Sequence, residues 1–182
     1  MEAKAKLFGH PIHQMLVPIP FGLLAMGALL DIADRFVDIT WLTLVSFYDI
    51  AIGLIAALVA AVFGAVDWSA IPNGTRAKRV GLLHAIANAL VILLFAFSLF
   101  VRADEAGFAV PLAALAAEVT ALVVAIVAGW LGGELVDRLG IGVHPDAHPD
   151  FRPCRRRPAH APHPARSAGE GGFGAEKLGG RA

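Results

Sequence analysis

The sequence predicts an all-α integral membrane protein, a four-helix transmembrane bundle followed by a disordered C-terminal tail. Three observations support this fold class. Hydrophobic residues make up 57% of the 182 residues and charged residues only 16%, whereas soluble domains are about one quarter charged. Four apolar runs are long enough to cross a bilayer, and the segment that follows them is rich in Pro, Arg, His and Gly.

The four apolar runs are the predicted transmembrane helices. A hydrocarbon core of about 30 Å requires about 20 apolar residues, because an α-helix rises about 1.5 Å per residue. The runs are rich in Ala and Leu and lack the alternation typical of strands. They cover residues 15–32, 41–66, 80–101 and 109–131. We expect the first run to be retained rather than cleaved as a signal peptide, because it is long and lacks a clear cleavage site.

The segment before the first helix carries two histidines and three prolines. Pro11 restricts its own φ angle and favours an extended backbone at His10. Pro18 and Pro20 fall in the first turns of the helix, where a missing N–H donor costs little. We therefore expect a stiff, partly unwound helix start that holds the rings of His10 and His13 in place.

The connections are short and divide the charges unequally. Residues 71–74 have turn chemistry, and Thr75 is the predicted N-cap of the third helix. The basic residues gather before the first helix, between the second and third helices, and after the fourth: Lys4, Lys6, Arg76, Lys78, Arg79 and Arg138. The other two connections are counted as holding two basic residues, Arg35 and Arg102. They are also counted as holding five acidic residues, Asp31, Asp34, Asp38, Asp104 and Glu105. Positive residues favour the cytoplasmic side, so both termini are predicted to be cytoplasmic.

The transmembrane domain is predicted to cover residues 1–143 and the tail residues 144–182. The tail composition cannot form a hydrophobic core, which indicates a disordered cytoplasmic segment. Its four histidines could bind metal weakly, and Arg155, Arg156 and Arg157 could lie on anionic lipid. A solvated tail is the simpler interpretation.

Small residues recur at every fourth position of the second and fourth helices, at positions 53, 57, 61 and 65 and positions 117, 121, 125, 129 and 133. Such stripes allow close helix packing, so these two helices could pack directly as a parallel pair. Asp49 and Glu118 lie beside the stripes, about 12 Å inside the outer surface. Intramembrane acids are candidate functional residues, and both are proton-path candidates. If the stripes meet, the two acids would share a proton; the favoured alternative is that each is protonated or hydrated separately.

A second group of polar residues is predicted at the cytoplasmic end of the bundle. His10 and His13 precede the first helix, while His84 lies one turn inside the third helix with Asn88 a further turn along. Asp67 and Glu134 end the second and fourth helices. Imidazoles backed by carboxylates suit a haem iron, a transition metal ion or a proton path. The alternative is that His10 and His13 are interfacial and His84 binds a neighbouring backbone.

Three segments resemble the DUF2231 family of bacterial multi-pass membrane proteins: "GHPIHQMLVPIPFGL", "GAVDWSAIPNGTRAKRVGLLHAIANAL" and "GWLGGELVDRLGIGV". The resemblance covers residues 8–143. It implies a bacterial inner-membrane protein of unknown function, and it places His10, His13, His84, Asp67 and Glu134 on motif positions. Some relatives are fused or adjacent to Rieske-type iron–sulfur domains, and the helical architecture is similar to small cytochrome b bundles; both suggest membrane electron transfer.

The sequence departs from the family pattern at three positions. Gln14 replaces a common proline of the first motif, and Asp137 and Leu139 stand where relatives often have tyrosine and histidine. If that histidine is a ligand in relatives, its absence weakens a haem assignment for this chain. The chain has one cysteine, Cys154, and no Rieske-type Cys/His pattern, so any iron–sulfur partner would be a separate protein.

The leading prediction is a small membrane redox subunit that binds haem b or a transition metal through His84 with His10 or His13. A transporter or proton-conducting protein that uses Asp49, Glu118 and His84 is the first alternative. A structural or assembly subunit, within a homo-oligomer or a larger complex, is the second. No catalytic nucleophile motif, phosphate-binding glycine loop or nucleic-acid signature is present, so the chain is not expected to be an enzyme on its own.

Overall fold

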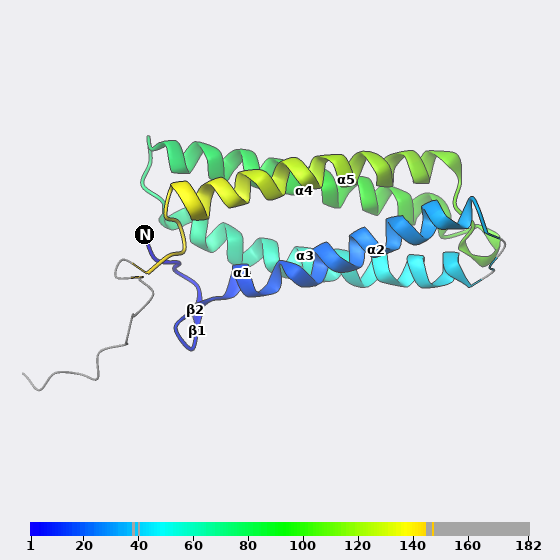
Figure 1. Ribbon diagram of the computed structural model, residues 1–182, viewed down its shortest axis with the longest axis horizontal. Coiled ribbons are helices and arrows are strands. Elements are labelled where there is room, and N and C mark those ends of the chain that lie inside the picture. The colour runs from blue at the N-terminus through cyan, green and yellow to red at the C-terminus, as the bar shows by residue number, and fades with distance from the viewer. Residues whose placement is uncertain (38, 40, 145–146, 148–182) are drawn as a thin grey trace, which may run out of the picture. The chain divides into compact units, whose positions relative to one another are not determined.

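The computed structural model describes residues 1–37, 39, 41–144 and 147. Its long helices are α2 (Pro18–Asp34), α3 (Leu42–Ala70), α4 (Arg76–Arg102) and α5 (Leu112–Gly133), and they form an antiparallel bundle (Figure 1). With the short helix α1 (Ile12–Leu16) before α2, four segments are long and apolar enough to span a membrane. The predicted all-α membrane fold is confirmed. The predicted tail lies outside the described residues, except for 144 and 147.

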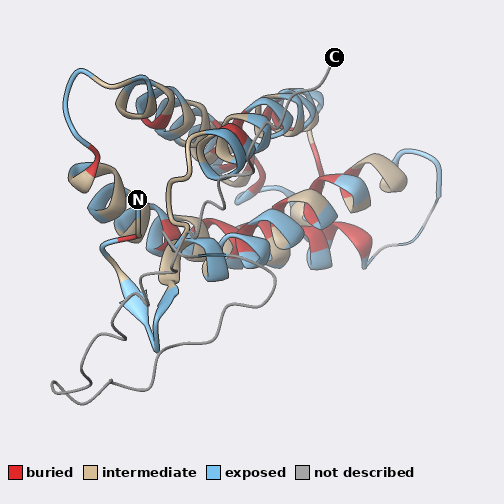
Figure 2. Ribbon diagram, turned by 60° about the vertical axis from the view of Figure 1, so that its left-hand side comes forward, coloured by how far each residue is buried: buried red, intermediate tan, exposed pale blue. Residues whose placement is uncertain are grey.

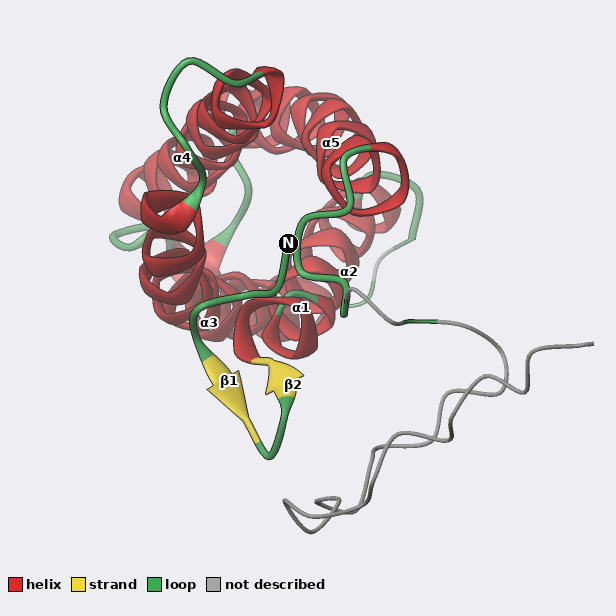
Figure 3. Cartoon of the chain, turned by 90° about the vertical axis from the view of Figure 1, so that its left-hand side faces the viewer, coloured by secondary structure: helices red, strands yellow, loops and turns green. Residues whose placement is uncertain are grey.

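The helices are arranged in a ring when the bundle is viewed along its axis (Figure 3). α2 packs mainly against α3 and α4 mainly against α5, while α3 also adjoins α4 and α2 adjoins α5. α3 and α5 therefore lie at diagonal corners of the ring. The possible direct packing of their small-residue stripes is wrong, because each helix makes its close contacts with its neighbours in the ring.

Glycines permit these neighbouring contacts. A Cβ atom at Gly27 of α2 would lie 2.6 Å from the Ile50 side chain of α3, and one at Gly53 would lie 3.0 Å from Leu24. Close approach of backbones at small residues is the usual basis of helix association in lipid. Gly27 and Gly53 thus bring α2 and α3 together in a helical hairpin, and Gly53 of the α3 stripe packs against α2 rather than α5.

The exterior of the bundle is apolar and much of the interior is small or polar. Buried and exposed residues alternate along the long helices (Figure 2). Large hydrophobic side chains such as Ile55, Phe100 and Leu112 are exposed, whereas Ala28 and Ala114 are fully buried. This is the reverse of a water-soluble helical protein, whose charged residues cover the surface. The surface is therefore suited to contact with lipid chains, as four spanning helices require.

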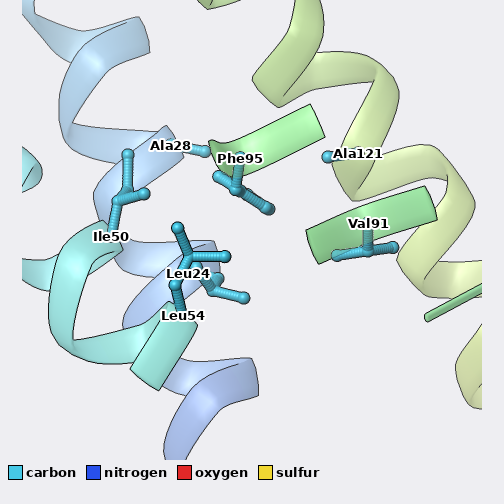
Figure 4. Close-up of a cluster of buried hydrophobic side chains, with 7 residues drawn as sticks. All are labelled: Leu24, Ala28, Ile50, Leu54, Val91, Phe95 and Ala121. Carbon is cyan, nitrogen blue, oxygen red and sulfur yellow. The ribbon is translucent and has the colours of Figure 1, made fainter. Parts of the chain in front are cut away.

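One compact apolar cluster occupies the middle of the bundle (Figure 4). All four long helices contribute to it, with the residues Leu24, Ala28, Ile50, Leu54, Val91, Phe95 and Ala121. Along each helix, the cluster residues lie between polar residues that are nearer to the two helix ends. The cluster consequently separates a polar region near the Met1 end from a second one near the opposite end.

The N-terminal segment folds over one end of the bundle. Strands β1 (Lys6–Leu7) and β2 (His10–Pro11) form an antiparallel hairpin whose turn has positive φ at Phe8 and Gly9. The α1–α2 helix has its boundary at Val17, immediately before Pro18. The predicted extended backbone at His10 and the proline-rich helix start are both confirmed. Thr75 is the N-cap of α4, as predicted, and accepts a hydrogen bond from Lys78 N at 3.1 Å.

The second and fourth apolar runs differ slightly from their helices. α3 continues past Asp67 to Ala70, since polar side chains at a helix end can reach water. α5 begins at Leu112 rather than at residue 109, because Pro111 holds the N-cap position with an extended backbone. Neither difference changes the number of spans or the order of the connections.

Candidate functional site

Two histidines from different hairpins face each other near the Met1 end of the bundle. The ring centroids of His13, on α1, and His84, on α4, lie 6.4 Å apart, and the ring planes are perpendicular at 89°. Both side chains are half-buried. Of the three predicted imidazole ligands, these two are brought together.

Each histidine is fixed by the helix that completes its hairpin. His13 Nδ1 lies 2.8 Å from the Ala60 carbonyl oxygen of α3, and His84 Nδ1 lies 2.9 Å from the Ala128 carbonyl oxygen of α5. A backbone carbonyl can only accept a hydrogen bond, so both Nδ1 atoms carry the proton and donate. In a neutral imidazole the lone pair is then on Nε2, the nitrogen left for a ligand. The alternative predicted for His84, a bond to a neighbouring backbone, is thus confirmed.

A glycine one turn beyond each carbonyl makes room for the ring. A Cβ atom at Gly64 would lie 2.9 Å from His13 Cε1, and one at Gly132 would lie 3.1 Å from His84 Cε1. Both rings therefore rest directly on the backbone of the partner helix. The same arrangement of carbonyl and glycine occurs in both hairpins, so the two histidines occupy structurally equivalent positions.

Asn88 lies next to the His84 ring, one turn along α4. Its Nδ2 donates to the His84 carbonyl oxygen at 2.8 Å and lies 3.2 Å from His84 Nε2. No comparable amide lies at His13, whose Nε2 has no hydrogen-bond partner among the described residues. A ligand that binds both Nε2 atoms would need Asn88 to turn away from the ring.

The other predicted ligands lie elsewhere. His10 is exposed in β2. Asp67 Oδ1 accepts hydrogen bonds from the backbone N–H groups of Lys4 and Ala5, at 2.7 and 2.8 Å, and so anchors the N-terminal segment. Within the described residues no three His, Cys, Asp or Glu side chains are grouped so as to hold a metal ion.

Glu134, at the start of the π-helical turn η2 (Glu134–Arg138), is bound by two arginines instead. Its Oε1 lies 2.5 Å from Arg76 Nη2 and its Oε2 lies 3.4 Å from Arg138 Nε. Glu134 is nearly buried while both arginines are exposed. This carboxylate links the start of α4 to the end of α5, and its charge is already compensated.

A buried ionic cluster lies toward the opposite end of the bundle. Arg102 of α4 binds Asp31 of α2 through two nitrogens, with Nη1 2.5 Å from Oδ2 and Nη2 3.3 Å from Oδ1. Arg102 Nη1 also lies 3.3 Å from Glu118 Oε1 of α5. All three side chains have 0% solvent exposure. We call Asp31, Arg102 and Glu118 the ionic cluster.

Neutral polar groups complete the surroundings of the ionic cluster. Arg102 donates to Ser46 Oγ at 3.1 Å and to the carbonyl oxygens of Thr43 and Phe108 at 3.0 and 3.1 Å. Ser98 donates to Glu118 Oε1. The Phe108 carbonyl belongs to the 3-10 helix η1 (Ala106–Phe108), in the connection between α4 and α5. Every nitrogen of the guanidinium therefore has an acceptor, as a buried cation requires.

The ionic cluster corrects three interpretations of the sequence. From the sequence alone, Asp31 and Arg102 are counted with the connections, but they are buried residues of α2 and α4. Glu118 is buried inside the bundle, and its carboxylate neighbour is Asp31. Asp49 is only half-buried on α3 and forms no ion pair among the described residues. The conditional pairing of Asp49 with Glu118, the less favoured of the two alternatives, is therefore wrong.

A repeated spacing in the sequence could have revealed the ionic cluster. The interval from His13 to Asp31 equals the interval from His84 to Arg102. Both pairs begin with a histidine at one end of the bundle and finish with a buried ionisable residue at the other. The two hairpins therefore share the same arrangement of residues. Asp31 and Arg102, which have opposite charges, occupy equivalent positions in it.

Comparison with known proteins agrees with the transmembrane architecture. No curated protein and no solved structure matches the chain significantly. A family model described as a predicted membrane protein, DUF2231, matches residues 9–145. This match covers the histidines, the ionic cluster and all four spanning segments. The chain therefore belongs to the DUF2231 family of predicted membrane proteins.

Proposed function

We propose that this protein is a small membrane redox protein that binds one metal centre, a haem iron or a transition metal ion, through His13 and His84. The observation that carries the proposal is the facing pair of imidazoles, one from each hairpin, with both Nδ1 atoms bound to backbone carbonyls. A metal-bound histidine typically donates its other ring N–H to a carbonyl or carboxylate, which fixes the tautomer. Both histidines have this arrangement.

The spacing of the pair suits a shared metal. The ring centroids lie 6.4 Å apart, so a single metal ion between the two rings would be held by His13 and His84. Two neutral imidazole donors suit iron and copper, and two histidines from different helices are a known way to hold a haem iron. When bound, such a metal supplies one-electron chemistry.

The chain's own residues define what surrounds such a centre. Ala60 and Ala128 orient the rings through their carbonyls, while Gly64 and Gly132 leave the rings seated on the helix backbones. The apolar cluster around Leu24 and Phe95 separates the pair from the ionic cluster. His10 is left out of the proposed ligand set because it is exposed in β2.

We propose that the Met1 end of the bundle faces the cytoplasm of a bacterial inner membrane. The positive-inside rule counts basic residues in short loops near the helix ends. Arg102 is buried in the ionic cluster, so Arg35 is the one accessible basic residue at the opposite end among the described residues. The histidine pair would then lie near the cytoplasmic surface, within reach of a separate redox protein such as an iron–sulfur protein.

Absorption spectroscopy and elemental analysis of the purified full-length protein test the proposal. We expect a Soret band, if the iron is in haem, or a bound iron or copper ion near one per chain without such a band. Either signal should be lost in His13→Ala and in His84→Ala and retained in His10→Ala, the matched control. A wild-type protein that stays colourless and metal-free after reconstitution with haem, iron and copper would overturn the proposal.

A further inference from the structure

We propose that the ionic cluster is a proton-binding site, in which one proton is held by the carboxyl group of Glu118. This inference is independent of the metal centre, because it concerns Asp31, Arg102 and Glu118 near the opposite end of the bundle. Nothing in the family description assigns a role to these residues. The ligand of this site is a proton, which Glu118 exchanges with solvent.

The first argument is the balance of charge. The ionic cluster contains two carboxyl groups and one guanidinium, all with 0% exposure. With both carboxylates ionised the cluster would carry one uncompensated negative charge inside the bundle. An isolated buried charge costs several kcal/mol, about as much as any single interaction in a protein can supply. One bound proton makes the cluster neutral.

The second argument identifies the carboxyl group that holds the proton. Asp31 is bound by Arg102 through both of its oxygens, as expected of an ionised carboxylate paired with a guanidinium. Glu118 has one longer contact with Arg102, at 3.3 Å, through Oε1. Its Oε2 is fully buried and faces no hydrogen-bond donor among the described residues. An ionised carboxylate would place negative charge on this buried oxygen with no donor to balance it. A protonated carboxyl group carries no charge.

The third argument is the proximity of the two acids. Asp31 Oδ2 and Glu118 Oε1 both contact Arg102 Nη1, at 2.5 and 3.3 Å. Two ionised carboxylates on the same guanidinium nitrogen repel each other, and a proton on one of them removes that repulsion. Protonation of Glu118 therefore removes the repulsion and leaves the ion pair of Asp31 with Arg102 intact.

The groups that face Glu118 come from every neighbouring helix. Asp31 lies on α2, Arg102 and Ser98 lie on α4, and Ser46 and the Thr43 carbonyl of α3 reach the site through Arg102. Thr43 also donates to the Gly107 carbonyl at 2.8 Å, which ties the connection between α4 and α5 over the cluster. Proton exchange with solvent on that side therefore requires this connection to open.

Infrared spectroscopy of the purified full-length protein in detergent or lipid tests the inference. The C=O stretch of a protonated carboxylic acid lies apart from the amide band and shifts in D₂O. We expect this band in the wild-type protein near neutral pH, and we expect it to move when glutamate is ¹³C-labelled at the side-chain carboxyl but not when aspartate is labelled. The labelling assigns the proton to glutamate without any mutation.

Variants then assign the band to Glu118 and test the charge balance. Glu118→Gln should remove the band, and Glu134→Gln should keep it, because Glu134 is a nearly buried glutamate already paired with two arginines. Asp31→Asn should also remove it, since Glu118 must then ionise to balance Arg102. Absence of the band from the wild-type protein, its movement with aspartate labelling, or its persistence in Glu118→Gln would each overturn the proposal.

Discussion

Arg102 Nη1 lies 2.5 Å from Asp31 Oδ2, and neither side chain is accessible to solvent. The pair joins α4 of one hairpin to α2 of the other across the interior of the bundle. Because Glu118 of α5 and the Ser46 hydroxyl of α3 contact the same guanidinium, a single cation connects all four long helices. The stability of the bundle should therefore depend more on Arg102 than on either of its acidic partners.

Arg102→Gln is expected to destabilise the folded protein by about 3–5 kcal/mol, the usual cost of leaving a buried charge without its partner. Asp31→Asn should cost less, because Glu118 remains to balance the guanidinium. Reversible unfolding of both variants in detergent would measure the difference. Equal losses in the two variants would contradict the shared role of Arg102.

Gly64→Ala and Gly132→Ala are expected to displace the histidine rings, because the added Cβ atoms would lie 2.9 and 3.1 Å from His13 and His84. Overpacking of this kind typically costs about 1–3 kcal/mol. Gly129→Ala is the matched control on α5, since its Cβ would meet nothing within 4 Å. Thermal unfolding compares the three variants, and a control as unstable as the other two would show that ring displacement is not the cause.

Metal or haem binding by the histidine pair should raise the melting temperature, because a ligand that binds only the folded state stabilises it by mass action. At a ligand concentration one hundred times the Kd, the gain is about 2.7 kcal/mol. Chelation or haem extraction should reverse the shift. The His84→Ala variant should show no ligand-dependent shift, whereas His10→Ala should behave like the wild-type protein.

Asp67→Ala is expected to release the N-terminal segment from the bundle. Asp67 accepts two backbone hydrogen bonds, from Lys4 and Ala5, and hydrogen bonds to a charged group contribute about 1.5–3 kcal/mol each when well protected. Amide hydrogen exchange at residues 4 and 5 should become faster. Glu2→Gln serves as the control, because exposed ion pairs contribute little. Unchanged exchange in Asp67→Ala would exclude the anchoring role.

Glu2 should give the N-terminal segment a weak pH dependence. A hydrogen bond from Lys6 lowers the pKa of the Glu2 carboxyl, with smaller contributions from the charges of Lys6, His144 and the N-terminus. A group with a lowered pKa in the folded state contributes stability above its ordinary pKa and loses it as the pH falls through the lowered value. The amide protection factors of residues 1–7, which are corrected for the intrinsic pH dependence of exchange, should therefore decrease only in acid, below the ordinary range of glutamate. In Glu2→Gln this acid step should be absent.

Much of the fold could be predicted because transmembrane helices have a strong sequence signal. Long apolar runs, the turn at residues 71–74 and the Thr75 cap each depend on local chemistry, and each was confirmed. The candidate site was predicted only in part. His13 and His84 meet, but Asp67 and Glu134 are engaged by the N-terminal backbone and by arginines. Spacing along one helix does not indicate which neighbour a side chain will contact.

The sequence by itself determined that this chain has four spanning helices, where the connections between them lie, and that Thr75 caps the third. These properties follow from hydrophobicity and backbone chemistry, which act over a few turns of helix. Only the tertiary structure decided that α3 and α5 lie diagonally, that Arg102 turns inward to Asp31 and Glu118, and that His13 faces His84. An ionisable residue near a helix end can reach water or fold inward, and the choice depends on whether partners from other helices offset its desolvation.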